Sequence, residues 1–464
     1  MGDTRVISIG LFLAIFGLLL FDGCQSSPTD EPSERHPGGS SGEVFPITIH
    51  YGLNDSHSNH WVQLSAAGVV GIVYGKGIVV GDIGQTGDLI YHTIQADGSE
   101  REEVVTRGSG VNKSVLLYDA GSKPHLFYAR SDDSDQFIYH FFKNHLGDWL
   151  SETVINFAGE GGKYIYEISA DIGRDDAIHL LVLKSRSNPD SPDYNWAFLD
   201  SNLYHITNRS GTWEKHWIKN YDTFYTYDVD TKTLRRQDMA VDDDGHVHVV
   251  FGEQIDVLGD DSCATGRLHY ATNKTGEWVI ELALEPITHP HEAGWSPSLC
   301  LDHRGRPAVA STYVARVLTL SMSDAHLAYS VRQDDGTWHT TVVADEADGY
   351  LGTDGGKYTG ALPHLKFDRQ NRPHIVFSDI ASSHGPYNYI NIGQIRYAAF
   401  NGRSWDLTTV YRQPSPQAFY TASEMGGQCL VISEDGERIQ VVGQELITTS
   451  KGVYTYQLVH FVIK

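Results

Sequence analysis

The sequence is short of sulfur and of positive charge. Its 464 residues include four cysteines and four methionines, and 35 lysines and arginines stand against 59 aspartates and glutamates, which gives a net charge of −24. After Cys24 only Cys263, Cys300 and Cys429 remain, and three widely spaced cysteines do not make a disulfide framework. Because nonspecific binding to nucleic acids or anionic membranes needs lysine and arginine to neutralise phosphates, the composition argues against such partners. An anionic ligand would need a local basic pocket.

Long apolar runs are also scarce, and the one present lies at the N-terminus. It reads VISIGLFLAIFGLLLF, follows Arg5 and precedes Asp22, Gly23 and Cys24. We expect residues 1–24 to be a secretory signal of the bacterial lipoprotein type, although Asp22 stands where such signals carry a small neutral residue. Lipidation of Cys24 would then be the only membrane attachment; plain secretion and an uncleaved anchor are the alternatives. The expected location is outside the cell or on the bacterial cell surface.

The segment after the signal has little that can be buried. Residues 25–44, QSSPTDEPSERHPGGSSGEV, are rich in Pro, Ser, Gly and Glu and predict a flexible tether. Residues 45–464 show no further break in composition, and we expect them to form a single catalytic domain.

A polar turn that ends in tryptophan recurs through this domain. The copies read NHLGDW, NRSGTW, NKTGEW, QDDGTW and, more loosely, FNGRSW, and their tryptophans at positions 149, 213, 278, 338 and 405 are 64, 65, 60 and 67 residues apart. Each copy follows a short alternating segment, and a hairpin with an Asp/Gly turn lies upstream, as in DAGSKPHLFYA and DDDGHVHVVFG. Each unit therefore predicts four antiparallel strands.

Repetition of a four-stranded unit is typical of a β-propeller, in which each small sheet buries its faces against its neighbours. We predict an all-β fold, a seven-bladed propeller of four-stranded antiparallel blades, with each tryptophan between two blades. The last blade lacks one strand, and FPITIHYG at residues 45–52 is expected to supply it and close the ring. Separate β-sandwich domains are the alternative, but they would need linkers that the sequence lacks.

The excess length of the units lies in connections that follow the second or fourth strand, and these should emerge on one face, where a rigid scaffold usually carries function. Tyrosines, lysines and arginines gather there, which favours a pocket for a carboxylated or sulfated ligand. Four histidines, His125, His179, His248 and His374, share one repeat position, and this repetition favours a structural role. A zinc site can be sketched from Cys263, His289 and His291, but their spacing is not a known zinc pattern. We predict no metal and no cofactor.

A series of short motifs resembles a known family. In order they read NHWVQLS, GIVYG, GDLIYHTI, SKPHLFYA, GGKYIYE, LKSRSN, YTYD, RRQD, AGWSPSL, DGYLGTDGGKYTGAL, SDIASSH and YRQP. This series resembles the seven-bladed propeller ulvan lyases of marine bacteria, the twenty-fifth polysaccharide lyase family. The resemblance implies β-elimination of a sulfated algal polysaccharide at the C4 side of a uronic acid. This reaction requires a cation that offsets the charge of the uronate carboxylate, a base that removes the C5 proton and an acid that protonates the leaving oxygen.

The resemblance also implies roles for particular residues. His125 becomes the catalytic histidine, Arg186 the residue that neutralises the carboxylate, and Tyr166 or Tyr227 the acid/base. Sugar and sulfate would be bound by three further residues, namely His60, Lys184 and Arg236. Repeat topology, however, puts His125 at the start of its strand, away from the face with the long connections.

Two other functions stay open. A carbohydrate-binding propeller lectin without chemistry should show near-equivalent pockets in every blade, whereas the long connections and cations here belong to only some units. A sialidase-like glycoside hydrolase should show an arginine trio and a Tyr/Glu pair. We expect a monomer whose partner is an anionic sulfated polysaccharide.

Overall fold

The computed structural model describes residues 47–463 with gaps. The gaps are residues 54–60, 80–85, 108–112, 132–135, 158–163, 188–197, 223–230, 257–263, 285–292, 320–321, 346–356, 385–388, 413–416, 419–428, 434–437 and 449–453. The described residues form strands, turns and bends, and no helix occurs among them. In this described part of the chain, accordingly, there is no helix of the length and apolar character needed to cross a membrane.

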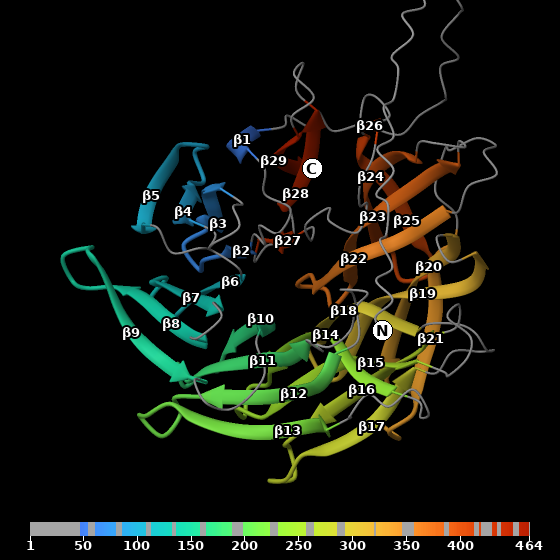
Figure 1. Cartoon of the computed structure of the whole chain (residues 1–464), viewed down its shortest axis with the longest axis horizontal. Helices are drawn as coiled ribbons and strands as arrows, with labels where there is room; N and C mark the ends of the chain where they lie inside the picture. The colour runs from blue at the N-terminus through green and yellow to red at the C-terminus, as the bar shows by residue number, and fades with distance from the viewer. Residues whose placement is uncertain are drawn as a thin grey trace, which may run out of the picture. The chain divides into compact units, whose positions relative to one another are not determined.

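The described strands form seven blades of four strands around a ring (Figure 1), and the fifth and sixth blades belong to one continuous sheet. The first three blades hold β2 (Trp61–Leu64), β3 (Val70–Val79), β4 (Thr86–Ile94) and β5 (Glu100–Thr106); β6 (Lys113–Tyr118), β7 (Pro124–Ser131), β8 (Gln136–Lys143) and β9 (Trp149–Asn156); and β10 (Tyr164–Ile172), β11 (Ile178–Ser187), β12 (Phe198–Thr207) and β13 (Glu214–Asp222). The next three hold β14 (Thr231–Val241), β15 (Val247–Asp256), β16 (Ala264–Thr272) and β17 (Val279–Leu284); β18 (Ala293–Leu301), β19 (Pro307–Thr319), β20 (Met322–Arg332) and β21 (Trp338–Ala344); and β22 (Lys357–Phe367), β23 (Pro373–His384), β24 (Tyr389–Phe400) and β25 (Trp405–Arg412). The last holds β27 (Cys429–Ile432), β28 (Ile439–Thr448), β29 (Tyr454–Ile463) and β1 (Ile47–Leu53).

Strand order within each blade follows chain order, and neighbouring strands of a blade are antiparallel. The fifth and sixth blades are joined by one parallel pairing, between Ala325 of β20 and Tyr358 of β22, and the two-residue β26 (Gln417–Ala418) is added to β24. Figure 1 shows the first strands of the blades near the centre and the fourth strands at the rim. The predicted seven-bladed propeller of four-stranded antiparallel blades is confirmed.

The last blade combines strands from the two ends of the domain. β1 pairs with β29, so that Ile47 faces His460 and Ile49 faces Leu458. The missing strand thus comes from the segment that the sequence pointed to. That this pairing holds the ring closed stays a prediction.

One copy of the recurring turn shows how an asparagine and a glycine can build it. In the second blade, Asn144 Oδ1 accepts the backbone N–H groups of Leu146 (2.8 Å) and Asp148 (3.0 Å). Gly147 has a φ of 87°, which a residue with a side chain adopts only with strain. The turn reverses the chain within a few residues, and Trp149 is the first residue of β9.

The tryptophan of each turn packs on the preceding blade. Trp149 lies edge to face with Tyr91 of the first blade, with ring centroids 5.4 Å apart, and its indole N–H donates to Glu103 (3.1 Å). Trp213 likewise donates to Glu152 of the second blade (3.1 Å). The prediction that these tryptophans lie between blades is confirmed. A buried aromatic ring contributes a large apolar area, and its N–H needs a partner there.

A second set of contacts joins the first strands of neighbouring blades. A side chain of each of four blades accepts a backbone N–H of the next blade. The pairs are Asp171 with Val241 (2.8 Å), Asp238 with Leu299 (2.8 Å), Ser298 with Leu365 (3.1 Å) and His364 with Leu430 (2.7 Å). These bonds fix the relative height of adjacent blades, and burial raises the pKa of the Asp238 carboxyl to about 6.

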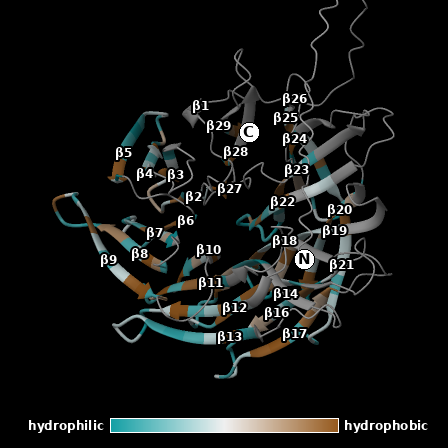
Figure 2. Ribbon diagram, viewed as in Figure 1, coloured by the Kyte–Doolittle hydropathy of each residue, from teal (hydrophilic) through white to brown (hydrophobic). Residues whose placement is uncertain are grey.

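The rim is more exposed than the interior, and it mixes polar strands with strands such as β17 that carry exposed apolar side chains (Figure 2). Figure 2 shows hydrophilic colour along β5 and β13, the fourth strands of the first and third blades. The side chains of β5 are largely exposed, whereas Leu116, Phe127 and Leu180 in first and second strands are fully buried. The alternation of buried and exposed residues therefore places the core between the blades.

Candidate functional site

The long connections leave one end of the sheets. In the third blade, Tyr164 pairs with Ser185 at this end and Ile172 pairs with Ile178 at the other, where a short turn joins the strands. The connections 188–197, 223–230, 257–263 and 285–292 all follow a second or fourth strand. We call the end from which they leave the loop face and the opposite end the turn face. The connections themselves lie outside the described residues.

Two cations and a carboxylate meet on the first strands of three adjacent blades. Glu167 of β10 accepts hydrogen bonds from Arg236 Nη1 of β14 (3.2 Å) and from the backbone N–H of Gln237 (2.9 Å). Burial lowers the pKa of Lys113 of β6 to about 8, and the positive charge of Arg236 adds to this effect while Glu167 opposes it. We call Lys113, Glu167 and Arg236 the cation cluster. With Lys113 protonated it carries one net positive charge.

Arg236 and Tyr166 occupy equivalent bulges in adjacent blades. The pairing of β14 with β15 shifts between Arg235 and Gln237, and the pairing of β10 with β11 shifts between Ile165 and Glu167. Arg236 has a φ of 30°, an uncommon and strained value for an arginine. Bulges re-aim a side chain and are common beside active sites. The backbone thus gives two of the predicted site residues matching positions.

Lys184 lies in the interior of the propeller. It sits on β11 opposite Ile165 of β10, is 1% exposed, and its ammonium lies 5.1 Å from the centre of the Phe157 ring of the second blade. A lysine so deeply buried packs inside the blade. Its predicted role in sugar binding is not tested further by this placement.

The other predicted residues of the loop face are described in part or not at all. Arg186 lies in β11 with its Cα opposite that of Asp200, two positions beyond Lys184 and near the end of the strand at the loop face. Only the backbone of Arg186 and of Tyr166 is described. Tyr227 and His60 lie outside the described residues, as do the hypothetical zinc ligands Cys263, His289 and His291 and the predicted lipidation site Cys24.

His125 lies at the turn face, in a structural network. Its Nδ1 is hydrogen bonded to His140 Nε2 (2.9 Å), and its Nε2 lies 3.7 Å from Asp119. Burial lowers the pKa of His125. The equivalent His248 and His374 are bonded to Tyr270 and Tyr397 in the same way. The histidine at this repeat position therefore joins the second and third strands of its blade, far along β7 from the loop face.

Sequence reasoning missed Lys113 and Glu167. Glu167 ends the motif GGKYIYE, in which the aromatic and basic residues gave the functional signal. Lys113 stands in VNKSVLLYD, which matches no motif. Nothing in either segment shows that three first strands bring the two side chains and Arg236 together. That proximity is a property of the ring.

One group of described residues could hold a cation on geometry alone. Ligand atoms of Asp242, Asp244 and His246 all lie within 4.8 Å of one another in the first turn of the fourth blade. Asp242 Oδ1, however, already accepts the N–H groups of Asp244 and His246 (3.0 and 2.8 Å), so the cluster is explained by the turn itself.

Comparison with known proteins leaves the family open. No family model matches the chain, and no curated protein matches its sequence. Similar solved structures include a protein of unknown function from Dyadobacter fermentans DSM 18053, with 11% identity, a TM-score of 0.45, and coverage of 90% of this chain and 98% of that chain. They also include the polysaccharide lyase Uly1, with 11% identity, a TM-score of 0.46 and coverage of 90% and 94%.

A third structure with this kind of similarity is the α-L-arabinanase of Penicillium chrysogenum complexed with arabinobiose. It shares 9% identity, gives a TM-score of 0.43, and the match covers 90% of this chain and 98% of that chain. At such values the likeness concerns the fold and carries no conclusion about activity. Function has to be argued from the residues of this chain.

Proposed function

We propose that the protein is a polysaccharide lyase that cleaves ulvan, a sulfated polymer of rhamnose and uronic acid, by β-elimination at the C4 side of the uronic acid. The observation that carries the proposal is the cation cluster. Arg236 is paired with Glu167, and the charges of both residues act on the buried ammonium of Lys113, in a protein whose net charge is −24. A local excess of positive charge in an acidic protein favours an anionic substrate. The type of reaction, β-elimination, is proposed from the series of motifs that resembles ulvan lyases.

The reaction explains why cations are needed there. The C5 proton of a uronate becomes acidic only when the charge of the neighbouring carboxylate is offset, because the negative charge spreads onto that carboxylate as the proton leaves. Arg186 is our candidate for this contact, since a guanidinium binds a carboxylate through two hydrogen bonds. Tyr166 or Tyr227 would remove the proton and protonate the leaving oxygen. Arg236, Lys184 and His60 would bind sugar and sulfate, and the catalytic role of His125 stays a prediction of the resemblance.

The first test follows the product of elimination. Incubation with ulvan should produce an unsaturated uronate, which absorbs in the ultraviolet, together with new reducing ends. New reducing ends without the absorbance would mean hydrolysis, and binding without either would mean a lectin. Both outcomes would replace the lyase proposal.

The second test concerns Arg186. We expect R186A to lower kcat on ulvan by on the order of a hundredfold or more, as loss of one group that stabilises the transition-state charge does elsewhere. The matched control is R403A, because Arg403 is an exposed arginine in a turn at the opposite face. Unchanged activity of R186A would remove Arg186 from the mechanism.

The remaining expectations belong to the same proposal. Secretion through the N-terminal signal and lipidation of Cys24 would place the enzyme where it meets a polymer too large to enter the cell. Labelling with a radioactive fatty acid and its loss in C24S would test lipidation. A monomer is expected, and its mass in solution is measured by light scattering.

A further inference from the structure

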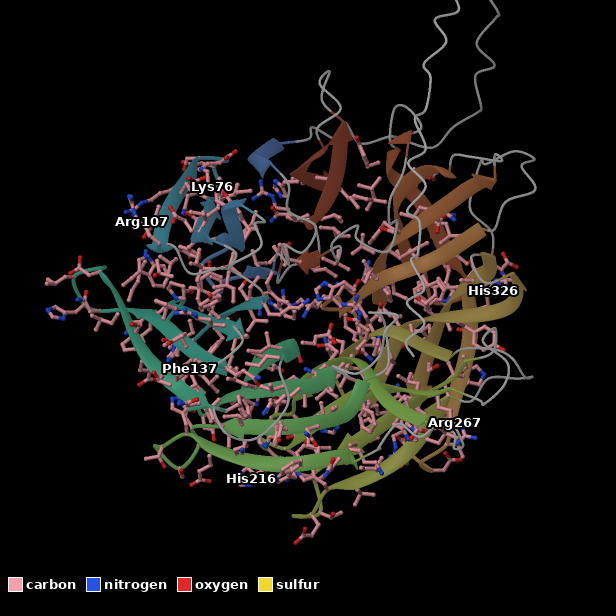
Figure 3. All side chains as sticks on the ribbon, in the orientation of Figure 1. Lys76, Arg107, Phe137, His216, Arg267 and His326 are labelled. Atoms are coloured by element: carbon pink, nitrogen blue, oxygen red, sulfur yellow. The ribbon has the colours of Figure 1, made fainter. Side chains whose placement is uncertain are left out.

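A polar cavity lies between the third and fourth blades at the turn face. It has a volume of about 730 Å³. Its lining comes from both blades and includes His179, His205, Arg209, Glu214, His216 and Trp278. His216 of β13 is labelled at the rim of the third blade in Figure 3. We call this the seam cavity, and it is separate from the cation cluster at the loop face.

The seam between the second and third blades has carboxylates at the positions equivalent to the seam cavity. There His125 and His140 share a hydrogen bond, and Glu152 accepts from His140 Nδ1 (3.0 Å) and from the indole N–H of Trp213 (3.1 Å). Asp119 lies beside His125 Nε2 (3.7 Å). Two histidines and a tryptophan are therefore accompanied by two carboxylates.

The seam cavity keeps the histidines and the tryptophan but lacks both carboxylates. His179 and His205 repeat the histidine pair, with Nδ1 and Nε2 2.9 Å apart, and Trp278 packs on His205 with ring centroids 5.7 Å apart. The residue opposite His205 is His216, where the second blade has Glu152 opposite His140. The turn that begins with Asp119 in the second blade begins with Gly173 in the third.

One buried nitrogen of the cavity is consequently left without a hydrogen-bond partner among the described residues. His179 is 2% exposed, and its Nε2 has no hydrogen-bond partner among the described residues. Glu152 binds the equivalents of His205 Nδ1 and Trp278 Nε1 in the second blade, and here His216 stands at the position of that carboxylate. Burial lowers the pKa of His179 to about 4 and that of His205 to about 3, so both rings are neutral at pH 7.

The contact between His179 Nδ1 and His205 Nε2 allows two arrangements of the protons, and the one that repeats the second blade has His205 protonated at Nδ1. A neutral His205 that donates through Nδ1 accepts from His179 through Nε2, which leaves His179 Nε2 as an acceptor. The cavity then offers two N–H donors, from His205 and Trp278, at the place that Glu152 fills in the second blade. Beside them it offers one acceptor, at His179.

Glu277 also lines the cavity, and three other charged residues there are already engaged. Arg209 is paired with Asp175 (3.1 Å) and donates to the carbonyl of Gly245 (3.0 Å). Glu214 accepts from the hydroxyl of Ser210 (2.7 Å). The ammonium of Lys215 lies over the Tyr204 ring, 4.9 Å from its centre. The hydrogen-bonding groups that the proposal uses are therefore those of the histidines and the indole.

We propose that the seam cavity binds an acidic saccharide, whose carboxylate or sulfate oxygen takes the place of the missing Glu152-like carboxylate. Two N–H donors suit such an oxygen, and the lone pair of His179 suits a neighbouring sugar hydroxyl. The choice of a saccharide rests on the proposed function, whereas the oxyanion requirement rests on the seam alone. This site would hold a second stretch of polymer at the face opposite the reaction.

The test restores the missing carboxylate. H216E should place a side-chain carboxylate between His205 and Trp278 and so compete with the ligand. We expect calorimetric titration of the full chain with inorganic sulfate and with glucuronate to show binding that H216E weakens by on the order of tenfold or more. The control H339E makes the same change of charge at an exposed histidine of β21 and should bind as the unchanged protein does.

A second variant keeps the test informative if H216E does not fold. W278F keeps an aromatic ring in the seam but removes the indole N–H, and it should also weaken binding of both anions. No measurable binding by the unchanged protein, or equal binding by H216E, W278F and H339E, would overturn the proposal. Binding of sulfate without glucuronate would identify a sulfate ester as the group that is recognised. Since these titrations need no cleavage, an inactive protein that still binds both anions would refute the proposed lyase and leave the seam cavity standing.

Discussion

Acid should weaken the last blade through His460. This side chain of β29 is 2% exposed, and its Nε2–H donates to Gln440 Oε1 (2.9 Å). Burial lowers its pKa to about 4, with the charges of Arg438 and His92 acting in the same direction. In the unfolded chain a histidine has a pKa of about 6.5. The folded state therefore binds fewer protons, and its stability falls as the pH drops from about 6.5 towards about 4.

The size of this effect follows from the two pKa values. Each pH unit between them costs about 1.4 kcal/mol, so His460 should remove about 2 kcal/mol from the free energy of unfolding at pH 5 relative to its value well above pH 6.5. H460Q keeps an N–H near the position of Nε2, and it does not titrate. Its loss of stability between pH 7 and pH 5 should be about 2 kcal/mol smaller than that of the unchanged protein.

Urea unfolding followed by tryptophan fluorescence measures this difference. Both proteins are unfolded at pH 7 and at pH 5, and the free energies are compared within each protein, so that effects common to the two cancel. Equal losses in the two proteins would refute the reasoning, because they would mean that His460 is either protonated when folded or equally hidden when unfolded.

Two further predictions concern single contacts. G360A should lower the free energy of unfolding by about 2 kcal/mol or more, because Gly360 has a φ of 83° and an added Cβ would lie 2.7 Å from Leu327 Cα, whereas G402A, at a φ of 93° with open space, should cost about 1 kcal/mol in the same denaturation assay. E281Q should cost about 1–2 kcal/mol, since Glu281 accepts from Arg332 at 2.7 and 3.1 Å, and most of this loss should vanish at high salt; a loss that salt does not change would rule out an ionic origin.

Much of the fold could be predicted because the repeat is local. The spacing of Trp149 and Trp213, and the Asp/Gly hairpin before each, are visible along the chain, and every unit of about 60 residues must bury two faces. Sheets with two apolar faces pack on equivalent neighbours, so the number of units gives the number of blades. Even the missing strand of the last blade could be found, since one alternating segment, Ile47–Leu53, stood outside the repeats.

The site was harder to predict, because its residues do not recur at equivalent positions in the repeats. Arg236 was chosen for its charge, and the structure adds its bulge and its partner Glu167. His125 was chosen through a resemblance, and the structure places it in the histidine pairing of the turn face. The seam cavity could not be predicted from the sequence, because it depends on two differences between blades. Gly173 stands at the position of Asp119 and His216 at that of Glu152, and these equivalences are seen only when the paired strands are compared.

By itself, then, the sequence determined the strands, the turns, the recurrence of the tryptophan in each unit and the acidity of the surface, since each can be found along the chain. The tertiary structure alone decided that Lys113, Glu167 and Arg236 meet, and that His179, His205 and Trp278 lack the carboxylates of the neighbouring seam. The physical reason is distance along the chain: these residues come from different blades, and only the packing of one sheet against the next brings their charges and hydrogen-bonding groups within reach of each other.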